Sequence, residues 1–462
     1  MQKGYHQAYA AWKRDPEAFW REAAADIDWF TPPERVFSPD EGIYGRWFSG
    51  AQTNTCHNCL DRHVTAGRGG ETAIIFDSAM TGEKRRFSYD EVLGEVKAIA
   101  ATLLALGIAR GDRVILYMPM LPQAVFSMLA CARIGAVHSV VFGGFAASEL
   151  AARIDDSGAR LVISASCGLE PGRVVAYKPL VDQAIEMARV KPERCLVLQR
   201  PQLRAELVGG RDEDFEAAVA PHRGAEVACV SVKATDPLYI LYTSGTTGQP
   251  KGVVRDNGGH MVALNWSMRN IYGLKPGEVF WTASDIGWVV GHSYIVYAPL
   301  ISGVTTLIFE GKPVGTPDAG AFWRVVAARR ARALHGADRL SRHPARRWGR
   351  RPDRALQDAQ FAGAVSCRRA GGSRDLEMGR THACHPRHRP LVADGDRLAD
   401  RRKSARPRRP ARQAWFAGAA DAGLRGNGAR RCRPSDRGGD ARQYRHQAAP
   451  AARLPADPLA CG

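Results

Sequence analysis

Short apolar strands alternate with helices in the front half of the chain, and this alternation restricts the possible folds more than any other feature. We expect strands at 114–117, 136–142 and 161–164, separated by helices at 122–134 and 147–154. The strand segments are β-branched and apolar along their length, with no regular polar alternation. Strands of this kind are covered on both faces, as in a parallel sheet with flanking helices. The sequence therefore predicts an α/β fold.

The helix that begins this series has a clear start signal. Ser88 and Glu91 form a capping box, in which each side chain accepts a hydrogen bond from a free backbone N–H at the helix start. Apolar residues then recur at helical spacing as far as Gly107. We therefore expect a helix between Ser88 and Gly107.

Charge is distributed unevenly along the 462 residues. Residues 1–330 hold 35 Lys and Arg against 35 Asp and Glu, whereas residues 331–462 hold 30 against 12 and so carry the whole net charge of +18. This tail contains 29 Arg and 27 Ala but no Ile and only two Val. Such a segment has little to bury, which predicts an irregular or disordered tail.

Two other interpretations of the tail remain open. A basic segment can bind nucleic acid, but the aromatic residues of this one are too scattered for a stacking platform, so we expect no nucleic-acid partner. The other interpretation is out-of-frame translation of a GC-rich gene, because Arg, Ala, Gly and Pro have GC-rich codons. Back-translating residues 390–403 and reading one base later gives a string that contains WWQTETG, and residues 358–379 give one that contains GER. We interpret residues 335–462 as a frameshift product.

No segment predicts secretion or a membrane span. The N-terminus carries charges every few residues and no apolar run, so we expect no signal peptide. The longest uncharged run, 286–309, is interrupted by Gly and Pro, which favours a buried helix followed by a strand. Ten cysteines without a secretion signal indicate reduced thiols. These features predict a cytoplasmic protein without a membrane partner.

Cys56 and Cys59 form a CxxC pair, with two histidines nearby. The front part contains no second CxxC at metal-ligand spacing, and no strand precedes the pair as in thioredoxin-like motifs. We therefore expect a buried loop and no metal site here.

Residues 242–252, YTSGTTGQPKG, carry the strongest chemical signal. They follow the apolar strand 238–241, and a strand that leads into a loop of small residues presents backbone N–H groups to phosphate. Gly245 and Gly248 allow close backbone approach. The hydroxyls and the cation come from Thr243, Ser244, Thr246, Thr247 and Lys251. The spacing differs from the GxxxxGK[ST] loop, and a polar turn without a ligand is the alternative.

The string YTSGTTGQPKG resembles the signature loop of the adenylate-forming superfamily of acyl-CoA synthetases, luciferases and peptide-synthetase adenylation domains. The strings at 47–64, 139–163 and 285–300 narrow the resemblance to the acetyl-/propionyl-CoA synthetase branch. Within that branch, 253–264 and 310–323 resemble propionate–CoA ligases more than acetyl-CoA synthetases.

The resemblance covers about residues 5–334 and implies a domain layout. Residues 1–80 would be an acetyl-CoA-synthetase-like N-terminal segment, and 81–334 an incomplete AMP-binding (adenylation) domain with parallel sheets and flanking helices. The Arg/Ala-rich tail, 335–462, would follow as out-of-frame sequence. The family's WWQTE motif, ribose-binding aspartate, hinge and C-terminal catalytic lysine are absent from the tail as written, so we expect this truncated chain to be inactive.

The resemblance also implies a two-step reaction. A carboxylate, propionate or alternatively acetate, attacks the α-phosphate of ATP–Mg²⁺ to give acyl-AMP and pyrophosphate, and the CoA thiol then displaces AMP. Such chemistry needs positioning and positive charge where negative charge accumulates. The loop 243–251 would hold the β- and γ-phosphates, with Lys251 as the catalytic cation.

Two further sets of residues take roles from the resemblance. Arg173 aligns with an arginine that contacts CoA phosphate, although the family's Gly-Gly-Arg is Pro171-Gly172-Arg173 here, and a solvated surface Arg is the alternative. The acyl-pocket wall aligns with Trp288, Val289, Val290 and Gly291. Val290, which we also assign to the CoA side, replaces a Thr of acetyl-CoA synthetases and would suit a longer acid; simple core packing is the alternative.

Overall fold

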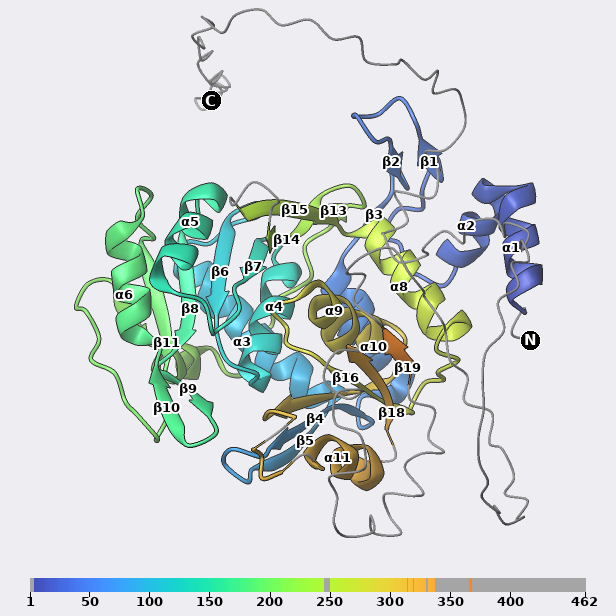
Figure 1. The fold of residues 1–462 in the computed structure, drawn as a ribbon. Helices are drawn as coiled ribbons and strands as arrows, with labels where there is room; N and C mark the ends of the chain where they lie inside the picture. The colour runs from blue at the N-terminus through green and yellow to red at the C-terminus, as the bar shows by residue number, and fades with distance from the viewer. Residues whose placement is uncertain are drawn as a thin grey trace, which may run out of the picture. The chain divides into compact units, whose positions relative to one another are not determined.

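The computed structural model describes residues 4–244, 250–313, 315–318, 320–329, 331–336 and 365–367 (Figure 1). These residues build two large β-sheets with helices packed against them, which confirms the predicted α/β class. The tail that we expect to be irregular lies outside the described residues, apart from residues 335–336 and the strand 365–367.

The larger sheet has seven strands in the order β12-β11-β8-β6-β7-β14-β15. Its strands are β6 (Arg113–Tyr117), β7 (Val137–Val140), β8 (Leu161–Ala165), β11 (Arg194–Leu198), β12 (Asp212–Asp214), β14 (Pro237–Ser244) and β15 (Pro250–Asp256). All neighbouring pairs are parallel except β14 and β15. The strands expected at 114–117 and 161–164 are confirmed, whereas the one expected at 136–142 ends at Val140.

Helices cover both faces of this sheet. They are α3 (Tyr89–Ala105), α4 (Pro122–Arg133), α5 (Ala147–Ser157), α6 (Lys178–Met187) and the short α7 (Phe215–Val219). Val114 and Leu116 of β6 join a core with α3 and α4, whereas Ile115 and Tyr117 join a second core with α5 and α6. Because side chains alternate between the two faces of a strand, burial on both faces explains why β6 is apolar from Val114 to Tyr117.

The capping box at the start of α3 is confirmed. Ser88 Oγ accepts a hydrogen bond from the Glu91 backbone N–H at 3.1 Å, and the Glu91 carboxylate accepts one from the Ser88 N–H at 2.7 Å. The helix ends at Ala105, and Gly107 adopts a φ of 79°, in the left-handed region that favours glycine.

The second sheet has six strands in the order β19-β18-β16-β17-β4-β5. They are β4 (Thr72–Ser78), β5 (Lys84–Ser88), β16 (Val279–Ala283), β17 (Thr305–Glu310), β18 (Arg332–Gly336) and β19 (Val365–Cys367). Helix α11 (Ala321–Arg329) packs on this sheet through Val325 and Val326, against a buried cluster that includes Trp281 and Leu307. Strand β19 comes from the Arg/Ala-rich segment and pairs with β18.

Smaller elements complete the described part of the chain. They are α1 (Tyr5–Arg14), α2 (Pro16–Ala24), β1 (Phe37–Ser38), β2 (Arg46–Trp47), β3 (Gln52–Thr53), η1 (His57–Asp61), η2 (Val64–Arg68), β9 (Cys167–Glu170), β10 (Arg173–Ala176), η3 (Ala220–His222), β13 (Val232–Lys233), α8 (Gly258–Asn270), α9 (Val289–Gly291), η4 (His292–Tyr297) and α10 (Ala298–Ile301). Three two-stranded sheets join β1 with β2, β9 with β10, and β3 with β13.

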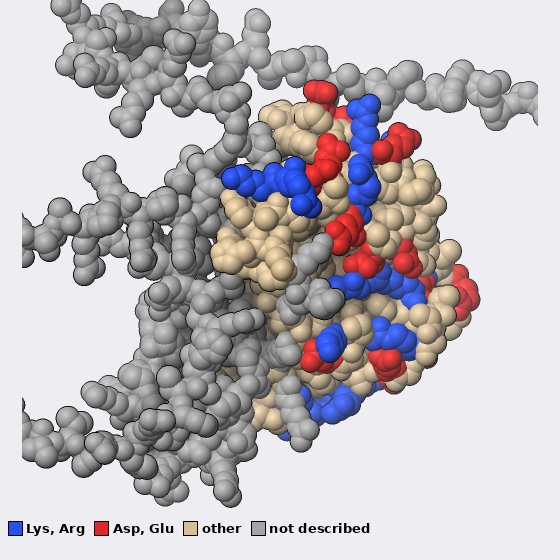
Figure 2. Space-filling view, turned by 90° about the vertical axis from the view of Figure 1, so that its right-hand side faces the viewer, with Lys and Arg blue, Asp and Glu red and all other residues tan. Residues whose placement is uncertain are grey.

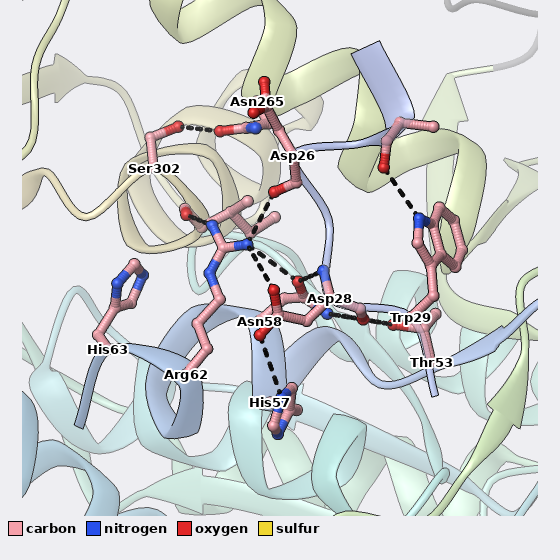
Figure 3. Close-up of polar contacts among 12 residues, drawn as sticks. Asp26, Asp28, Trp29, Thr53, His57, Asn58, Arg62, His63, Asn265 and Ser302 are labelled. Carbon is pink, nitrogen blue, oxygen red and sulfur yellow. Dashed lines mark hydrogen bonds and ion pairs between the residues drawn. The ribbon is translucent and has the colours of Figure 1, made fainter. Parts of the chain in front are cut away.

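Arg62 attaches the N-terminal region to the rest of the fold (Figure 3). Its guanidinium donates hydrogen bonds to the Asp26 carbonyl at 3.0 Å, to Asn58 Oδ1 at 3.1 Å and to the Ile301 carbonyl. The Asn58 amide in turn donates to the Asp28 carbonyl at 3.1 Å. One half-buried side chain therefore joins segments around residues 26, 58 and 301.

The predictions for the CxxC pair and for the uncharged run 286–309 have different outcomes. Cys56 and Cys59 are fully buried, as expected, but they lie in a helical stretch that runs from Thr55 to Ala66, before Gly67 adopts a φ of 77°, so the predicted loop is wrong. The uncharged run 286–309 does form buried helix followed by a strand, with η4 and α10 preceding β17. None of the described helices is long and apolar enough to cross a membrane.

The described surface carries both signs of charge. Figure 2 shows Lys and Arg side chains interspersed with Asp and Glu on one face of the molecule. Several of these charges are paired, for example Arg160 with both Asp112 and Glu193 at 2.8 and 3.0 Å. The mixture agrees with the balanced charge count of residues 1–330.

Candidate active site

The carboxyl ends of the parallel strands define where the candidate site lies. Strands β6, β7, β8 and β14 run in the same direction, so the segments that follow them emerge at one edge of the sheet. Ligands of open α/β sheets bind at this edge. The segment after β7 contains Phe142, Gly143, Gly144 and Phe145, and the segment after β14 is the candidate phosphate loop.

The two ends of the phosphate loop lie side by side. Thr243 of β14 pairs with Lys251 of β15, and Ser244 pairs with Pro250. Thr243 Oγ1 donates a hydrogen bond to the Lys251 carbonyl at 3.5 Å, and both residues are exposed. Gly245, Thr246, Thr247 and Gly248 lie outside the described residues. The strand expected at 238–241 is confirmed as part of β14.

The end of β14, just before the phosphate loop, is attached to helix α5. Tyr242 Oη donates a hydrogen bond to Asp156 at 2.6 Å. The Arg153 guanidinium lies 5.4 Å from the centre of the Tyr242 ring and 4.8 Å from that of Phe145, distances typical of cation–π contacts. Arg153 is itself buried and paired with Glu149 at 2.8 Å. Tyr242, which directly precedes the predicted phosphate-binding residue Thr243, is therefore attached to helix α5.

An aromatic cluster joins the two sheets at this edge. Trp288, which follows β16 of the six-stranded sheet, lies 5.6 Å from Phe142 and 6.2 Å from Phe145, ring centre to ring centre. A Cβ on Gly287 would lie 2.8 Å from the Phe142 Cα, so the backbones themselves are in close contact. Trp288, Phe145, Arg153 and Tyr242 thus form a continuous line of contacts from the expected acyl wall to the expected phosphate loop.

The four residues of the expected acyl wall differ in their surroundings. Trp288 and Val289 are 41% and 42% exposed, whereas Val290 is half-buried against the main core. Gly291 is buried, and a Cβ there would lie 1.9 Å from the Asp285 carbonyl oxygen. The first two residues are available to a ligand, and the last two also serve packing.

Asp285 adds a titratable group beside this wall. Its carboxylate accepts a hydrogen bond from the Gly287 N–H at 2.8 Å. Burial raises the pKa of the Asp285 carboxyl to about 6, although the Gly287 N–H and the Lys312 ammonium act in the opposite direction. A carboxyl with such a pKa near a ligand-binding edge is a candidate functional group.

Arg173 lies on the β9–β10 hairpin at the end of β8. It pairs with Glu170 across the hairpin, and its guanidinium contacts the Glu170 carboxylate at 2.7 and 3.0 Å. The hairpin is tied to the segment after β7 through Tyr177, since a Cβ on either Gly143 or Gly168 would lie within 2.5 Å of the Tyr177 ring or hydroxyl. Arg173 itself is exposed.

Comparison with known proteins identifies the family. Residues 60–369 match the family described as AMP-binding enzyme, and residues 5–59 match the one described as acetyl-coenzyme A synthetase N-terminus. The chain belongs to the AMP-binding enzymes. The resemblance of the YTSGTTGQPKG loop to adenylate-forming enzymes is therefore confirmed.

Individual relatives of this AMP-binding enzyme are short-chain acyl-CoA synthetases. The human mitochondrial acyl-CoA synthetase short-chain family member 3 is 51% identical over 334 residues, which cover 72% of the chain and 48% of the relative. A propionate–CoA ligase of Salmonella typhimurium is 48% identical over 312 residues, 68% of the chain and 49% of the relative. The chain thus spans about half the length of the curated relatives it matches.

Several residues at the candidate ligand edge were not singled out by the sequence. They are Phe142, Phe145, Arg153, Asp156, Tyr177 and Asp285. One signal was available, because a Phe-Gly-Gly-Phe string directly after a buried strand indicates a close-packed loop at the ligand edge. The partners of Arg153 and Tyr177 come from other elements, and no local sequence pattern predicts these contacts.

Proposed function

We propose that this AMP-binding enzyme derives from a propionate–CoA ligase that joins propionate to CoA through an acyl-adenylate, with acetate as the alternative acid. The observation that carries the proposal is the line of contacts from Trp288 through Phe145 and Arg153 to Tyr242. It connects a partly exposed apolar wall to the two ends of a Gly/Thr-rich loop. An adenylating enzyme needs this arrangement, because the carboxylate and the α-phosphate must meet.

The loop would hold the phosphates of ATP. Thr243, Ser244, Thr246 and Thr247 offer hydroxyls, Gly245 and Gly248 offer close backbone N–H groups, and Lys251 offers positive charge to the departing pyrophosphate. Mg²⁺ would enter with the ATP phosphates. The exposure of Thr243 and Lys251 supports this role, since both are open to a bound anion.

CoA would approach from the hairpin side. Arg173 would contact a CoA phosphate, with Val290 near the thiol end of the same ligand. Glu170 competes for the Arg173 guanidinium at 2.7 Å, so binding would require this exposed ion pair to open. Exposed ion pairs contribute only about 0–1 kcal/mol, so the requirement is modest.

The acid would lie against Trp288, Val289, Val290 and Gly291. A valine at 290 adds apolar surface where a longer acyl chain would end. One methylene changes discrimination by only about 1–3 kcal/mol, so acetate is the alternative acid. The names of the bacterial relatives, propionate–CoA ligases, support propionate.

The proposal includes a domain layout and a compartment. We place the N-terminal segment at 1–80, the incomplete adenylation domain at 81–334 and an out-of-frame tail at 335–462. The chain as written would be inactive, and the protein would act on small molecules in the cytoplasm without nucleic acid or membrane partners.

The test uses a protein whose reading frame is restored near Leu334. We expect pyrophosphate release that requires ATP, CoA and propionate, with higher kcat/KM for propionate than for acetate. Val290→Thr should reduce that preference by roughly threefold or more, because an apolar contact is lost, within the limit of about 1–3 kcal/mol. Val254→Thr, on an exposed position of β15, is the matched control. Preference for acetate in the unmutated enzyme would exclude the propionate assignment.

A further inference from the structure

Two cysteine thiols from distant parts of the sequence lie next to each other away from the phosphate loop. The Cys56 and Cys229 sulfur atoms and one Asp61 carboxylate oxygen all lie within 4.8 Å of one another. Cys56 is fully buried at the start of the η1 stretch, and Cys229 is part-buried in the irregular segment 225–231. The Cys229 thiol donates a hydrogen bond to Asp61 at 3.6 Å.

Arg133 of α4 decides which chemistry this group of residues can support. Its guanidinium contacts both Asp61 carboxylate oxygens at 2.9 Å and donates to the Cys56 sulfur at 3.5 Å. Its Nε also donates to the Val227 carbonyl at 2.6 Å, and the side chain is 2% exposed. A buried cation that already occupies both carboxylate oxygens repels a divalent metal ion. The two thiols are therefore better placed to react with each other than to bind metal.

We propose that Cys56 and Cys229 are an oxidation site at which hydrogen peroxide, or another small hydroperoxide, converts the two thiols into an intramolecular disulfide. Cys229 is the accessible member of the pair, because Cys56 has no exposed surface. The two sulfur atoms lie within 4.8 Å of each other, and disulfide formation requires them to approach to about 2.05 Å.

The reaction balances with peroxide as the two-electron oxidant. The Cys229 sulfur attacks one peroxide oxygen, the O–O bond breaks, and the Cys229 proton leaves with the departing hydroxide as water. The Cys56 sulfur then attacks the sulfenic sulfur of Cys229, the S–S bond forms and the S–O bond breaks. The Cys56 proton joins the leaving hydroxide as a second water. The two thiols lose two electrons and the peroxide gains them.

The surroundings make this oxidation slow at neutral pH. The hydrogen bond with Cys56 and burial raise the pKa of the Cys229 thiol; Asp61 acts in the same direction and the Arg133 guanidinium in the opposite one. Because the thiolate is the nucleophile, the rate should rise roughly tenfold per pH unit between pH 7 and 9. The site would thus respond to sustained peroxide rather than to brief exposure.

The disulfide would connect the two regions that the family comparison separates. Cys56 falls within residues 5–59, which match the acetyl-coenzyme A synthetase N-terminus, and Cys229 falls within the AMP-binding match. The same junction already depends on Asn54, whose amide donates to the Ala132 and Val230 carbonyls at 2.9 Å. Oxidation would add a covalent bond to a junction that hydrogen bonds maintain in the reduced protein.

Peptide mapping of the full chain tests the proposal directly. The purified protein is treated with hydrogen peroxide at pH 7 and pH 9, free thiols are blocked, and tryptic peptides are analysed by mass spectrometry without reduction. We expect peptide 47–62 linked to peptide 224–233, more of it at pH 9, and its disappearance after dithiothreitol. The same treatment in urea should reduce the yield of this link relative to other cysteine pairs.

Three variants assign the link to the two sulfur atoms. Peptide 47–62 also contains Cys59, so the link should persist in Cys59→Ser and be absent in Cys56→Ser and Cys229→Ser. A Cys56–Cys59 disulfide, a Cys229 that stays a thiol or becomes sulfinic acid, or a link found only between separate chains would each overturn the proposal. The wild-type map decides by itself if a variant fails to fold.

Discussion

Asp285 shows how one buried carboxyl can make stability depend on pH. Its pKa is raised from 3.8 to about 6, so the folded protein keeps a proton that the unfolded chain releases between these pH values. Stability should therefore fall as pH rises from about 4 to about 6, and the full cost should remain at neutral pH.

The variant Asp285→Asn should remove this dependence, because Asn keeps the oxygen that accepts from Gly287 but does not ionise. Relative to wild type, the variant should gain roughly 1–3 kcal/mol between pH 4.5 and pH 7. Urea unfolding at both pH values measures the difference, and other titrating groups cancel in the comparison. An equal effect of the substitution at both pH values would contradict the raised pKa.

Gly291 is expected to line the acyl pocket, but its tight packing can be tested separately through the stability of the fold. A Cβ at this position would lie 1.9 Å from a backbone oxygen, which cannot rotate away as a side chain can. We expect Gly291→Ala to destabilise the fold by about 1–3 kcal/mol, measured by urea unfolding.

Gly94 is the matched control for that experiment. It lies on an exposed face of α3, and a Cβ there would meet no atom within 4 Å. Gly94→Ala should stabilise the protein by about 0.5–1 kcal/mol, because alanine loses less backbone freedom in a helix. Equal effects of the two substitutions on stability would contradict the close contact between Gly291 and the Asp285 carbonyl.

At the scale of elements, the β14–β15 hairpin is attached to helix α5 just before its loop, and the residues on either side of that loop are exposed. Tyr242 is bound to Asp156, whereas Thr243 and Lys251 reach the surface next to each other. The hairpin can therefore present Lys251 to a phosphate at a constant position. In the frame-restored protein, Lys251→Ala should slow adenylation by about 10²–10³-fold, as loss of one transition-state contact does.

Single-turnover pyrophosphate release measures that step, and Lys275→Ala provides a control on an exposed lysine in the loop between α8 and β16. The control should leave the rate within about twofold of the parent, since surface charges away from a site have small effects. Equal rates for Lys251→Ala and the parent would mean that the phosphates bind elsewhere.

The sequence predicted elements whose signals are local. The apolar strands β6 and β8 and the capping box of α3 appear where their patterns indicate, because burial on both faces and helix capping are properties of consecutive residues. Residues 141–142 leave β7 despite their apolar character, because the chain turns there toward Trp288. Contacts such as Arg153 with Tyr242 join α5 to β14 and have no local signature.

The same distinction explains the error at Cys56 and Cys59. The CxxC spacing suggests a loop when the pair is read alone. In the structure, the Asn54 side chain accepts hydrogen bonds from the Cys56 and His57 N–H groups and starts a helix. An Asn before the pair was a visible capping signal. The proximity of Cys229, by contrast, depends on the fold and could not be predicted.

At the scale of the whole molecule, two kinds of sequence share one chain. Residues 1–330 carry balanced charge and form the two cores on the faces of the seven-stranded sheet, whereas the segment from 331 carries the entire excess of +18. The six-stranded sheet crosses this division, because β18 begins at Arg332 and β19 lies at Val365–Cys367. The division therefore falls within a folded sheet, which a natural domain boundary would avoid.

The final prediction concerns the chain as written compared with its frame-restored form. In the proposed frameshift, the string WWQTETG belongs to the shifted reading frame of residues 390–403, so the chain as written would lack the group expected on the adenine side of ATP. Nucleotide would be held by its phosphates alone, and the acid and the α-phosphate would not be brought together. We expect no propionyl-CoA from the chain as written and ATP-dependent propionyl-CoA formation after restoration, both measured by chromatography of the thioester. Restoration should also raise the unfolding temperature, because apolar strands would replace Arg-rich sequence beside β18. Propionyl-CoA turnover by the unaltered chain would show that residues 335–462 are not frameshifted, and an inactive restored protein would show that the loss lies elsewhere.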